Sequence, residues 1–229
     1  MQSNSDVLPA IEIETGAAPD AAVIWLHGLG ADGNDFVPVV PELDLPASLA
    51  VRFVFPHAPS IPITWNNGYV MPGWYDIYSL EEGRRHADEN GIRRTRDAVR
   101  ALIARENARG VPTHRIVLAG FSQGGAIAYI AGLTHPDTLA GIVALSTYIA
   151  APALLDSERS AANAHTPIFA AHGIEDPVVP PELGGAAREV VIRYGNPIEW
   201  HAYRMPHTVC LEEIAQIGAW LAKRLAPAS

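Results

Sequence analysis

The hydrophobic positions of this chain fall into short runs, each of which ends at a glycine, proline or polar residue. These runs are residues 23–26, 51–55, 116–118, 139–145, 168–171 and 198–203, with a weaker one at 11–13. Short runs rich in Val, Ile and Phe and bounded by Gly or Pro are typical of buried strands. We therefore expect six buried strands and a weaker opening strand.

Helical periodicity separates these runs. Four apolar residues between Ile92 and Ile103 share one face of a segment whose other face carries arginines. From Cys210 to Leu225 the apolar residues recur every three or four positions, which indicates an amphipathic helix. Residues 181–194 are a further candidate helix with a less regular apolar pattern. Strands that alternate with helices predict an α/β protein, with a mostly parallel sheet covered by helices on both faces.

Residues 56–82 break this alternation. Prolines are spread through the segment and argue against regular structure. Five aromatic residues accompany them, namely Trp65, Tyr69, Trp74, Tyr75 and Tyr78. A long aromatic loop without secondary structure in a compact domain is usually functional. We expect this loop to border the substrate site.

Composition narrows the class of protein. The 229 residues carry a formal charge of −9, which disfavours nucleic acid and anionic lipid surfaces. The single cysteine, Cys210, excludes an internal disulfide framework. No run of about 18 apolar residues is present, and the polar residues 1–6 do not resemble a secretory signal. We expect one domain over residues 1–229, a flexible N-terminus over 1–10, no integral membrane association and a cytoplasmic location.

The strongest chemical motif is Gly-Phe-Ser-Gln-Gly at residues 120–124. It follows an apolar run and precedes residues 125–131, which have a helical composition. This is the G-x-S-x-G pattern in its required context of strand, sharp turn and helix. The pattern predicts that Ser122 is a nucleophile, exposed on a strained turn whose flanking glycines avoid collisions.

A nucleophilic serine needs a base, and in sheets of this type the acid and then the histidine follow the serine along the chain. Asp176 follows the run 168–171 by a short turn, and the rigid step to Pro177 favours it over the adjacent Glu175. Asp156, in a loop without a preceding strand, is a weaker candidate. The expected base is His207, which follows the last strand. The competing histidines, His135, His165 and His201, lie before or inside a strand or after a helix.

Backbone donors for an oxyanion are predicted at two places. The first is the N–H of Gln123, directly after the nucleophile, and the second is the N–H of Leu29 in the glycine-rich loop 27–33. That loop lacks the Gly-Lys-Ser/Thr ending of a nucleotide-binding loop. His27 and His172 each precede a glycine at a strand end, where an imidazole can brace the turn. No metal-binding motif is present, so we expect neither a metal nor a cofactor.

Five motifs in the same order resemble the phospholipase/carboxylesterase family, which includes bacterial carboxylesterases and acyl-protein thioesterases. They are His-Gly-Leu-Gly-Ala-Asp-Gly at 27–33, Met-Pro-Gly-Trp-Tyr-Asp-Ile at 71–77, Gly-Phe-Ser-Gln-Gly-Gly at 120–125, His-Gly-x-x-Asp-Pro-Val-Val-Pro at 172–180 and Pro206-His207. The resemblance implies a minimal single-domain α/β-hydrolase fold without a large cap, and a triad of Ser122, Asp176 and His207. It also suggests that Trp65, Trp74 and Tyr75 border the acyl site. Pro206 and Tyr75 stand where many relatives carry glycine and phenylalanine.

The sequence therefore predicts a serine carboxylesterase acting on esters of short to medium acyl chain. An acyl-protein thioesterase or lysophospholipase is the alternative within the same chemistry, and a catalytically silent binding module is the alternative from another class. The expected partner is a small-molecule ester or thioester. A homodimer is compatible with the sequence.

Overall fold

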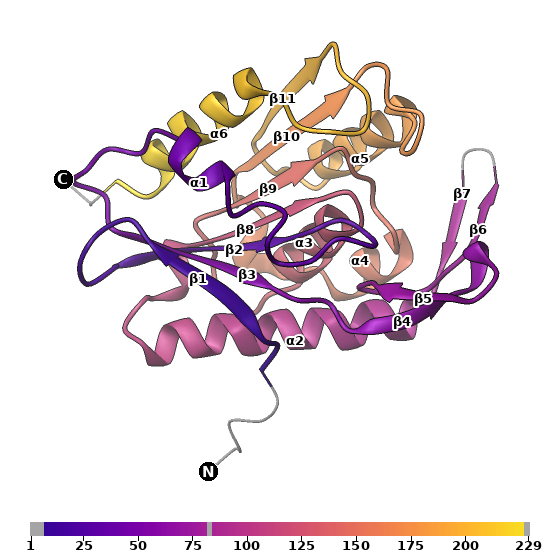
Figure 1. Ribbon diagram of the computed structural model, residues 1–229, viewed down its shortest axis with the longest axis horizontal. Helices are drawn as coiled ribbons and strands as arrows, with labels where there is room; N and C mark the ends of the chain where they lie inside the picture. The colour runs from indigo at the N-terminus through magenta and orange to yellow at the C-terminus, as the bar shows by residue number, and fades with distance from the viewer. Residues whose placement is uncertain (1–6, 82–83, 227–229) are drawn as a thin grey trace.

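A twisted seven-stranded sheet forms the centre of the computed structural model, which describes residues 7–81 and 84–226 (Figure 1). Its strands lie in the order β1-β3-β2-β8-β9-β10-β11. They are β1 (Ala10–Glu14), β2 (Ala21–Leu26), β3 (Val51–Pro56), β8 (Ile116–Phe121), β9 (Gly141–Leu145), β10 (Ile168–Gly173) and β11 (Ile198–Tyr203). All neighbours are parallel except β1, which runs antiparallel to β3. The predicted mostly parallel sheet is confirmed, and the carboxyl ends of its parallel strands meet at one edge.

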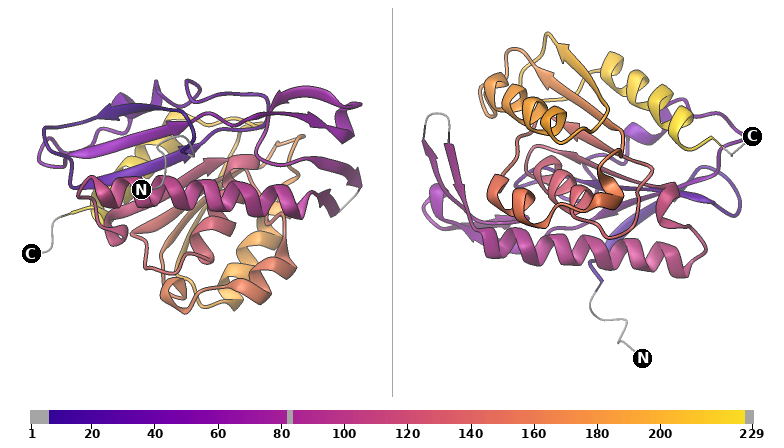
Figure 2. Two further views of the ribbon diagram at one scale, coloured as in Figure 1. Left: turned by 90° about the horizontal axis from the view of Figure 1, so that it is seen from below. Right: turned by 180° about the vertical axis from the view of Figure 1, so that it is seen from behind.

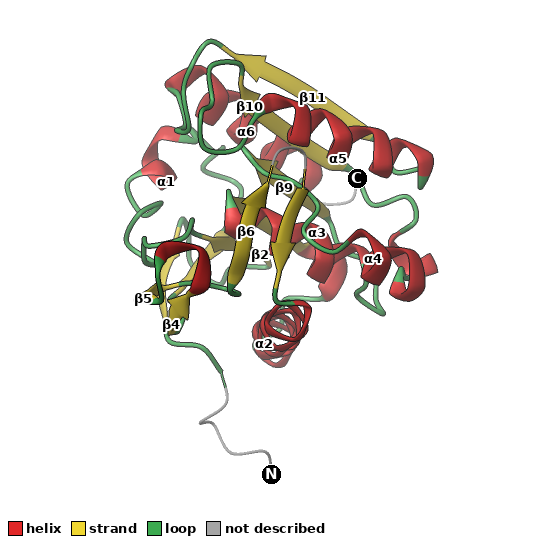
Figure 3. Ribbon diagram, turned by 90° about the vertical axis from the view of Figure 1, so that its right-hand side faces the viewer, coloured by secondary structure: helices red, strands yellow, loops and turns green. Residues whose placement is uncertain are grey.

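Helices cover both faces of this sheet (Figure 2). One face packs against α2 (Glu89–Ala108), α3 (Gln123–Leu133), α4 (Pro152–Glu158) and α5 (Pro181–Arg193). The other packs against the short α1 (Val39–Glu42) and against α6 (Leu211–Arg224). Figure 3 shows α2 end-on beneath the strands. Short 3-10 turns occur at Thr64–Asn66, Thr113–Arg115 and Ala161–Asn163.

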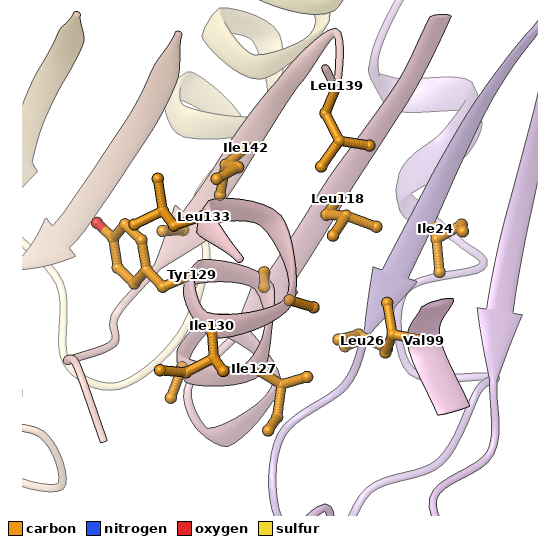
Figure 4. Packing of buried hydrophobic residues seen from close by; sticks show 14 of the residues in the cluster. Ile24, Leu26, Val99, Leu118, Ile127, Tyr129, Ile130, Leu133, Leu139 and Ile142 are labelled. Carbon is orange, nitrogen blue, oxygen red and sulfur yellow. The ribbon is translucent and has the colours of Figure 1, made fainter. Parts of the chain in front are cut away.

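The helix that follows the candidate nucleophile lies in the middle of the core. Every residue of α3 is buried, as expected for a helix that is apolar all round. Its Ile127, Ile130 and Leu133 pack near Leu118 of β8 and Ile142 of β9 (Figure 4). Ser122 therefore stands at the junction of a buried strand and a buried helix, where the backbone has little freedom to move.

The aromatic segment is not the structureless loop that the sequence predicted. It forms two antiparallel hairpins, one of β4 (Ser60–Ile63) with β5 (Tyr69–Pro72) and one of β6 (Ile77–Glu81) with β7 (Arg84–Ala87). Pro62 and Pro72 fit because each strand of a two-stranded sheet has an open edge that needs no N–H donor. The connection of the first hairpin, residues 64–68, starts with the 3-10 turn Thr64–Asn66 and ends in Asn67 and Gly68, whose φ angles are 53° and 73°. This Asn-Gly pair was the available turn signal.

The predicted flexible N-terminus also needs adjustment. Residues 1–6 lie outside the described residues, but Val7 and Leu8 pack against the core and Ala10 pairs with Pro56. Within residues 7–81 and 84–226, no helix is both long and apolar enough to span a bilayer.

A buried carboxyl group in the first turn of α6 gives a prediction about stability. The Glu213 side chain is fully buried; Oε2 accepts a hydrogen bond of 3.4 Å from the N–H of Cys210. No partner for Oε1 occurs among the described residues. Burial raises the pKa of Glu213 from its usual 4.5 to about 8.

The pKa of Glu213 in the folded state lies above its value in the unfolded state, so the folded protein binds this proton more tightly. The resulting stabilisation is complete below the unfolded pKa and is lost as the pH rises through about 8. We expect Glu213→Gln, which cannot ionise, to raise the free energy of unfolding more at pH 8.5 than at pH 5. Denaturant titrations at both pH values measure this difference. The exposed Glu212→Gln is the control, and an equal effect of Glu213→Gln at both pH values would contradict the assignment.

Candidate active site

Ser122 occupies the sharp turn between β8 and α3, with φ 55° and ψ −120°. The turn requires glycines on both sides of the serine. A Cβ on Gly120 would lie 2.3 Å from the carbonyl oxygen of Gly124, and one on Gly124 would lie 2.3 Å from that of Leu26. The Thr147 hydroxyl donates a hydrogen bond of 2.6 Å to the carbonyl of Ser122 and fixes the turn from the next strand end. The predicted collisions at the flanking positions are thus present in the structure.

Asp176 lies in the turn after β10 and is buried. Its Oδ1 accepts hydrogen bonds of 2.8 Å from the N–H groups of Val178 and Val179. Its Oδ2 lies 2.6 Å from Nδ1 of His207. The two backbone donors hold the carboxylate in one orientation, with its second oxygen directed at the histidine.

The alternative acids do not reach His207. Glu175 points to the surface and pairs with Arg204 at 3.0 Å. Asp156 accepts a hydrogen bond of 2.5 Å from the Tyr194 hydroxyl. Asp176 is thus the candidate acid whose carboxylate contacts His207, and its catalytic role stays a prediction.

His207 lies between β11 and α6, and its ring centroid is 4.6 Å from that of Phe121. Since a carboxylate can only accept, the Nδ1–H of His207 donates to Asp176, and in the neutral form of this ring Nε2 carries the lone pair. The competing histidines lie elsewhere: His135 bonds the backbone of Asp137, His165 is exposed, and His201 stacks on Phe169.

Ser122 and His207 line one cavity of about 230 Å³. Most other side chains in its wall are apolar or aromatic, namely Leu29, Ala31, Trp65, Ile77, Phe121, Tyr148 and Val178, and the polar ones are Asp35 and Gln123. The cavity thus places a hydroxyl and an imidazole beside a surface suited to an acyl chain. Sequence reasoning missed Tyr148 and Val178, although both follow strands that end at this edge of the sheet.

The loop after β2 is braced by His27, as the sequence suggested. Its Nδ1–H donates to the carbonyl of Gly28 at 2.7 Å, and its Nε2 accepts from the N–H of Ala58 at 3.1 Å. Burial lowers the pKa of His27 below its usual value. A neutral imidazole is what this pattern requires, because one ring nitrogen donates and the other accepts.

Leu29 and Gln123 border the same cavity as Ser122. Across the described part of the chain, neither backbone N–H donates to a protein acceptor. Gln123 is also the first residue of α3, where free N–H groups favour negative charge. Both groups are available to a ligand oxygen.

The three predicted substrate residues occupy different places. Trp65 lines the cavity and is about half exposed. Trp74 and Tyr75 are buried and instead line a second cavity of about 440 Å³ against α2. The hydroxyl oxygens of Tyr75 and Tyr148 are 2.9 Å apart, so Tyr75 contacts a residue that lines the first cavity. Trp74 and Tyr75 were expected to border the acyl site, but they line the second cavity and not the one that contains Ser122.

His172 forms a hydrogen bond within the acid turn, in which its Nε2–H donates to the carbonyl of Val179 at 2.9 Å. No three His, Cys, Asp or Glu side chains are grouped as metal ligands in the region that the structure describes.

Comparisons with known proteins identify the family that this chain resembles. The family model described as Phospholipase/Carboxylesterase matches residues 9–225. Acyl-protein thioesterase 1 of Neurospora crassa is 41% identical over 226 residues, which cover 95% of this chain and 92% of that protein. The protein of the same name from Mycosarcoma maydis is 38% identical over 227 residues, covering 93% and 95%.

Two solved structures extend the comparison. Arabidopsis thaliana SOBER1 matches with a TM-score of 0.84 and 32% identity, covering 90% of this chain and 99% of that one. Esterase PE8 matches with a TM-score of 0.80 and 28% identity, covering 96% of this chain and 100% of that one.

The fold and the site define a serine hydrolase with a single-domain α/β-hydrolase architecture. Within that class, the chain belongs to the phospholipase/carboxylesterase family, because the family model and the curated relatives match almost its whole length.

Proposed function

We propose that this serine hydrolase cleaves acyl thioesters, as well as carboxylic esters of short to medium chain length, through an acyl-enzyme on Ser122. The observation that carries the proposal is the 2.6 Å contact between Asp176 and His207, beside the cavity that His207 shares with Ser122. Relatives named acyl-protein thioesterase 1 favour thioesters among the natural substrates. Lysophospholipids are the alternative with the same chemistry.

In the proposed mechanism, Nε2 of His207 takes the hydroxyl proton of Ser122 while Oγ attacks the carbonyl carbon of the substrate. The carbonyl oxygen becomes an oxyanion and accepts hydrogen bonds from the N–H groups of Leu29 and Gln123. His207 then gives the proton to the departing alcohol or thiol, which leaves an acyl ester on Ser122. A water molecule, activated by His207, releases the acid and restores the serine.

Asp176 supports both halves of this cycle. Its carboxylate selects the tautomer in which Nε2 of His207 is free to accept a proton, and it stabilises the imidazolium that forms. The N–H groups of Val178 and Val179 hold the other carboxylate oxygen, so that the aspartate does not turn away during turnover.

The acyl group would lie along the apolar wall formed by Leu29, Trp65 and Val178. A cavity of about 230 Å³ accommodates a chain of moderate length, and the partly exposed Trp65 leaves it open at the surface. Each methylene buried there contributes about 0.8 kcal/mol. Catalytic efficiency should therefore increase with chain length until the cavity is full.

A series of soluble p-nitrophenyl esters from acetate to octanoate, run beside the matching thioesters, tests this proposal. We expect both series to be hydrolysed below their solubility limits, with kcat/KM rising up to about fourfold per methylene. Trp65→Ala should flatten this rise while changing acetate hydrolysis little. Tyr69→Ala is the matched control, because Tyr69 lies on the same hairpin and is more exposed.

Three outcomes would contradict the proposal. A sharp increase in rate on micelles or emulsions, with poor turnover of soluble esters, would identify a lipase. Equal effects of Trp65→Ala and Tyr69→Ala would remove Trp65 from the acyl wall. Absence of turnover together with no labelling by a fluorophosphonate would identify a binding module. A homodimer and a cytoplasmic location stay predictions, to be checked by light scattering and cell fractionation.

A further inference from the structure

A four-residue segment, Pro72–Tyr75, contacts both sides of the proposed oxyanion site. It begins with the last residue of β5 and joins the first hairpin to the second. Its contacts are buried hydrogen bonds rather than contacts with the acyl cavity. The segment therefore connects parts of the site that are far apart in the sequence.

On one side the segment brackets Leu29. The indole Nε1–H of Trp74 donates a hydrogen bond of 2.8 Å to the carbonyl of His27, two residues before Leu29. The N–H of Gly30, the next residue, donates a bond of 2.8 Å to the carbonyl of Pro72. Between these bonds, a Cβ on Gly73 would lie 3.0 Å from Cδ1 of Leu29. The peptide that carries the Leu29 N–H is thus fixed on both sides.

On the other side the segment is held by the side chain of Gln123. Its Oε1 accepts a hydrogen bond of 2.7 Å from the N–H of Trp74, and its Nε2–H donates one of 2.8 Å to the carbonyl of Tyr75. Gln123 and Trp74 are each 2% exposed, so water does not compete for these bonds. Gln123 thus supplies one proposed oxyanion donor, its backbone N–H. Its side chain holds the segment Pro72–Tyr75, which in turn fixes the loop that carries the other proposed donor, the Leu29 N–H.

The segment is itself fixed to the body of the domain. The hydroxyl of Thr95 in α2 donates a short hydrogen bond to the carbonyl of Trp74. The indole ring also lies against the His27 ring, with centroids 4.9 Å apart. Trp74 therefore joins α2, the loop after β2 and the first turn of α3 through buried contacts.

We propose that Trp74 and the side chain of Gln123 are positioning residues that set the separation of the Leu29 and Gln123 N–H groups. This inference rests on the proposed function, because it assumes that those groups bind the oxyanion. Oxyanion donors stabilise the transition state only when they already point at the place where charge develops. Loss of the indole bond should impair the chemical step, whatever the length of the acyl chain.

The test is Trp74→Phe, which keeps an aromatic ring and removes the indole N–H. The matched control is Trp220→Phe, because Trp220 is also buried, lies in α6 and has an Nε1 without a hydrogen-bond partner in the described residues. We expect Trp74→Phe to lower kcat by about 10- to 100-fold, with KM changed less than about twofold. The fold-decrease in kcat should be the same for the acetate and octanoate esters. Trp220→Phe should leave kcat within about twofold.

Gln123→Met removes the two hydrogen bonds from the Gln123 side chain to Trp74 and Tyr75 and gives a second test. If the bonds form one network, the double variant Trp74→Phe/Gln123→Met should lose less activity than the product of the single losses. A trifluoromethyl ketone supplies a readout specific to the oxyanion, since its adduct with Ser122 carries a negatively charged oxygen. Its affinity should fall by about the same factor as kcat/KM, and melting curves report on folding.

The inference is overturned if Trp74→Phe behaves like Trp220→Phe, or if its effect is absent with acetate and grows with chain length. The second result would make Trp74 part of the acyl wall. Failure of the proposed function itself is seen separately, because Ser122→Ala would then retain turnover. If Ser122→Ala loses turnover but Trp74→Phe leaves kcat unchanged, only the positioning role of Trp74 is refuted.

Discussion

Replacing Ser122 with alanine is expected to lower kcat by about 10⁴- to 10⁶-fold while leaving the fold intact. The hydroxyl is the atom proposed to form the acyl bond, and a methyl group cannot replace it. The buried strand and helix on either side hold the turn independently of that hydroxyl. Steady-state hydrolysis of a butyrate ester measures the loss, and circular dichroism checks the fold.

Ser146 supplies a matched control for this substitution. It follows the neighbouring strand β9, is buried and also has a positive φ, at 44°. Ser146→Ala should retain turnover, since Ser146 is not among the residues that line the catalytic cavity. Retention of most activity in Ser122→Ala, with the acyl adduct mapped by mass spectrometry to another residue, would refute the assignment.

Asp176→Asn is expected to lower kcat by about 10³- to 10⁴-fold. An asparagine amide can donate to Nδ1 of His207, which would favour the tautomer whose Nε2 carries the proton and cannot accept one from Ser122. Fluorophosphonate labelling of Ser122 should slow by a similar factor. This comparison separates a defect in acylation from one in substrate binding.

Glu175→Gln is the control for the acid, because Glu175 is adjacent in the chain but pairs with Arg204 at the surface. It should change kcat less than about twofold, as expected for a solvent-exposed ion pair. If Glu175→Gln were the damaging change and Asp176→Asn the mild one, the acid would have to be reassigned.

The parts of the fold that the sequence predicted are those that leave a local pattern. Strands of a parallel sheet are buried on both faces, so β2, β8 and β10 contain continuous apolar runs, and the run in β3 is interrupted by Arg52. Ser122 was identifiable because its turn requires glycines at fixed positions. Loops at the carboxyl ends of parallel strands meet at one edge, which predicted that Asp176 and His207 lie close together, and their side chains are 2.6 Å apart.

The rest depended on contacts that no local pattern encodes. The first hairpin between β3 and α2 was hidden by Pro62 and Pro72, which are tolerated there because its strands have open edges. The second hairpin contains no proline, and its first strand was simply included in the expected loop. The position of Trp74 depends on three partners from distant parts of the chain, namely His27, Thr95 and Gln123. Composition marked this tryptophan as part of an aromatic loop but could not say which way its ring would face.

The order in which the layers close has a consequence for synthesis on the ribosome. One face of the sheet is covered mainly by α6, since α1 has only four residues. His207 lies in the loop before α6, which begins at Leu211. A nascent chain that ends before residue 207 would therefore expose the apolar side chains of this face and lack the proposed base. Such incomplete chains would be prone to aggregation and inactive. Folding and activity should consequently appear together, only after the last helix has emerged.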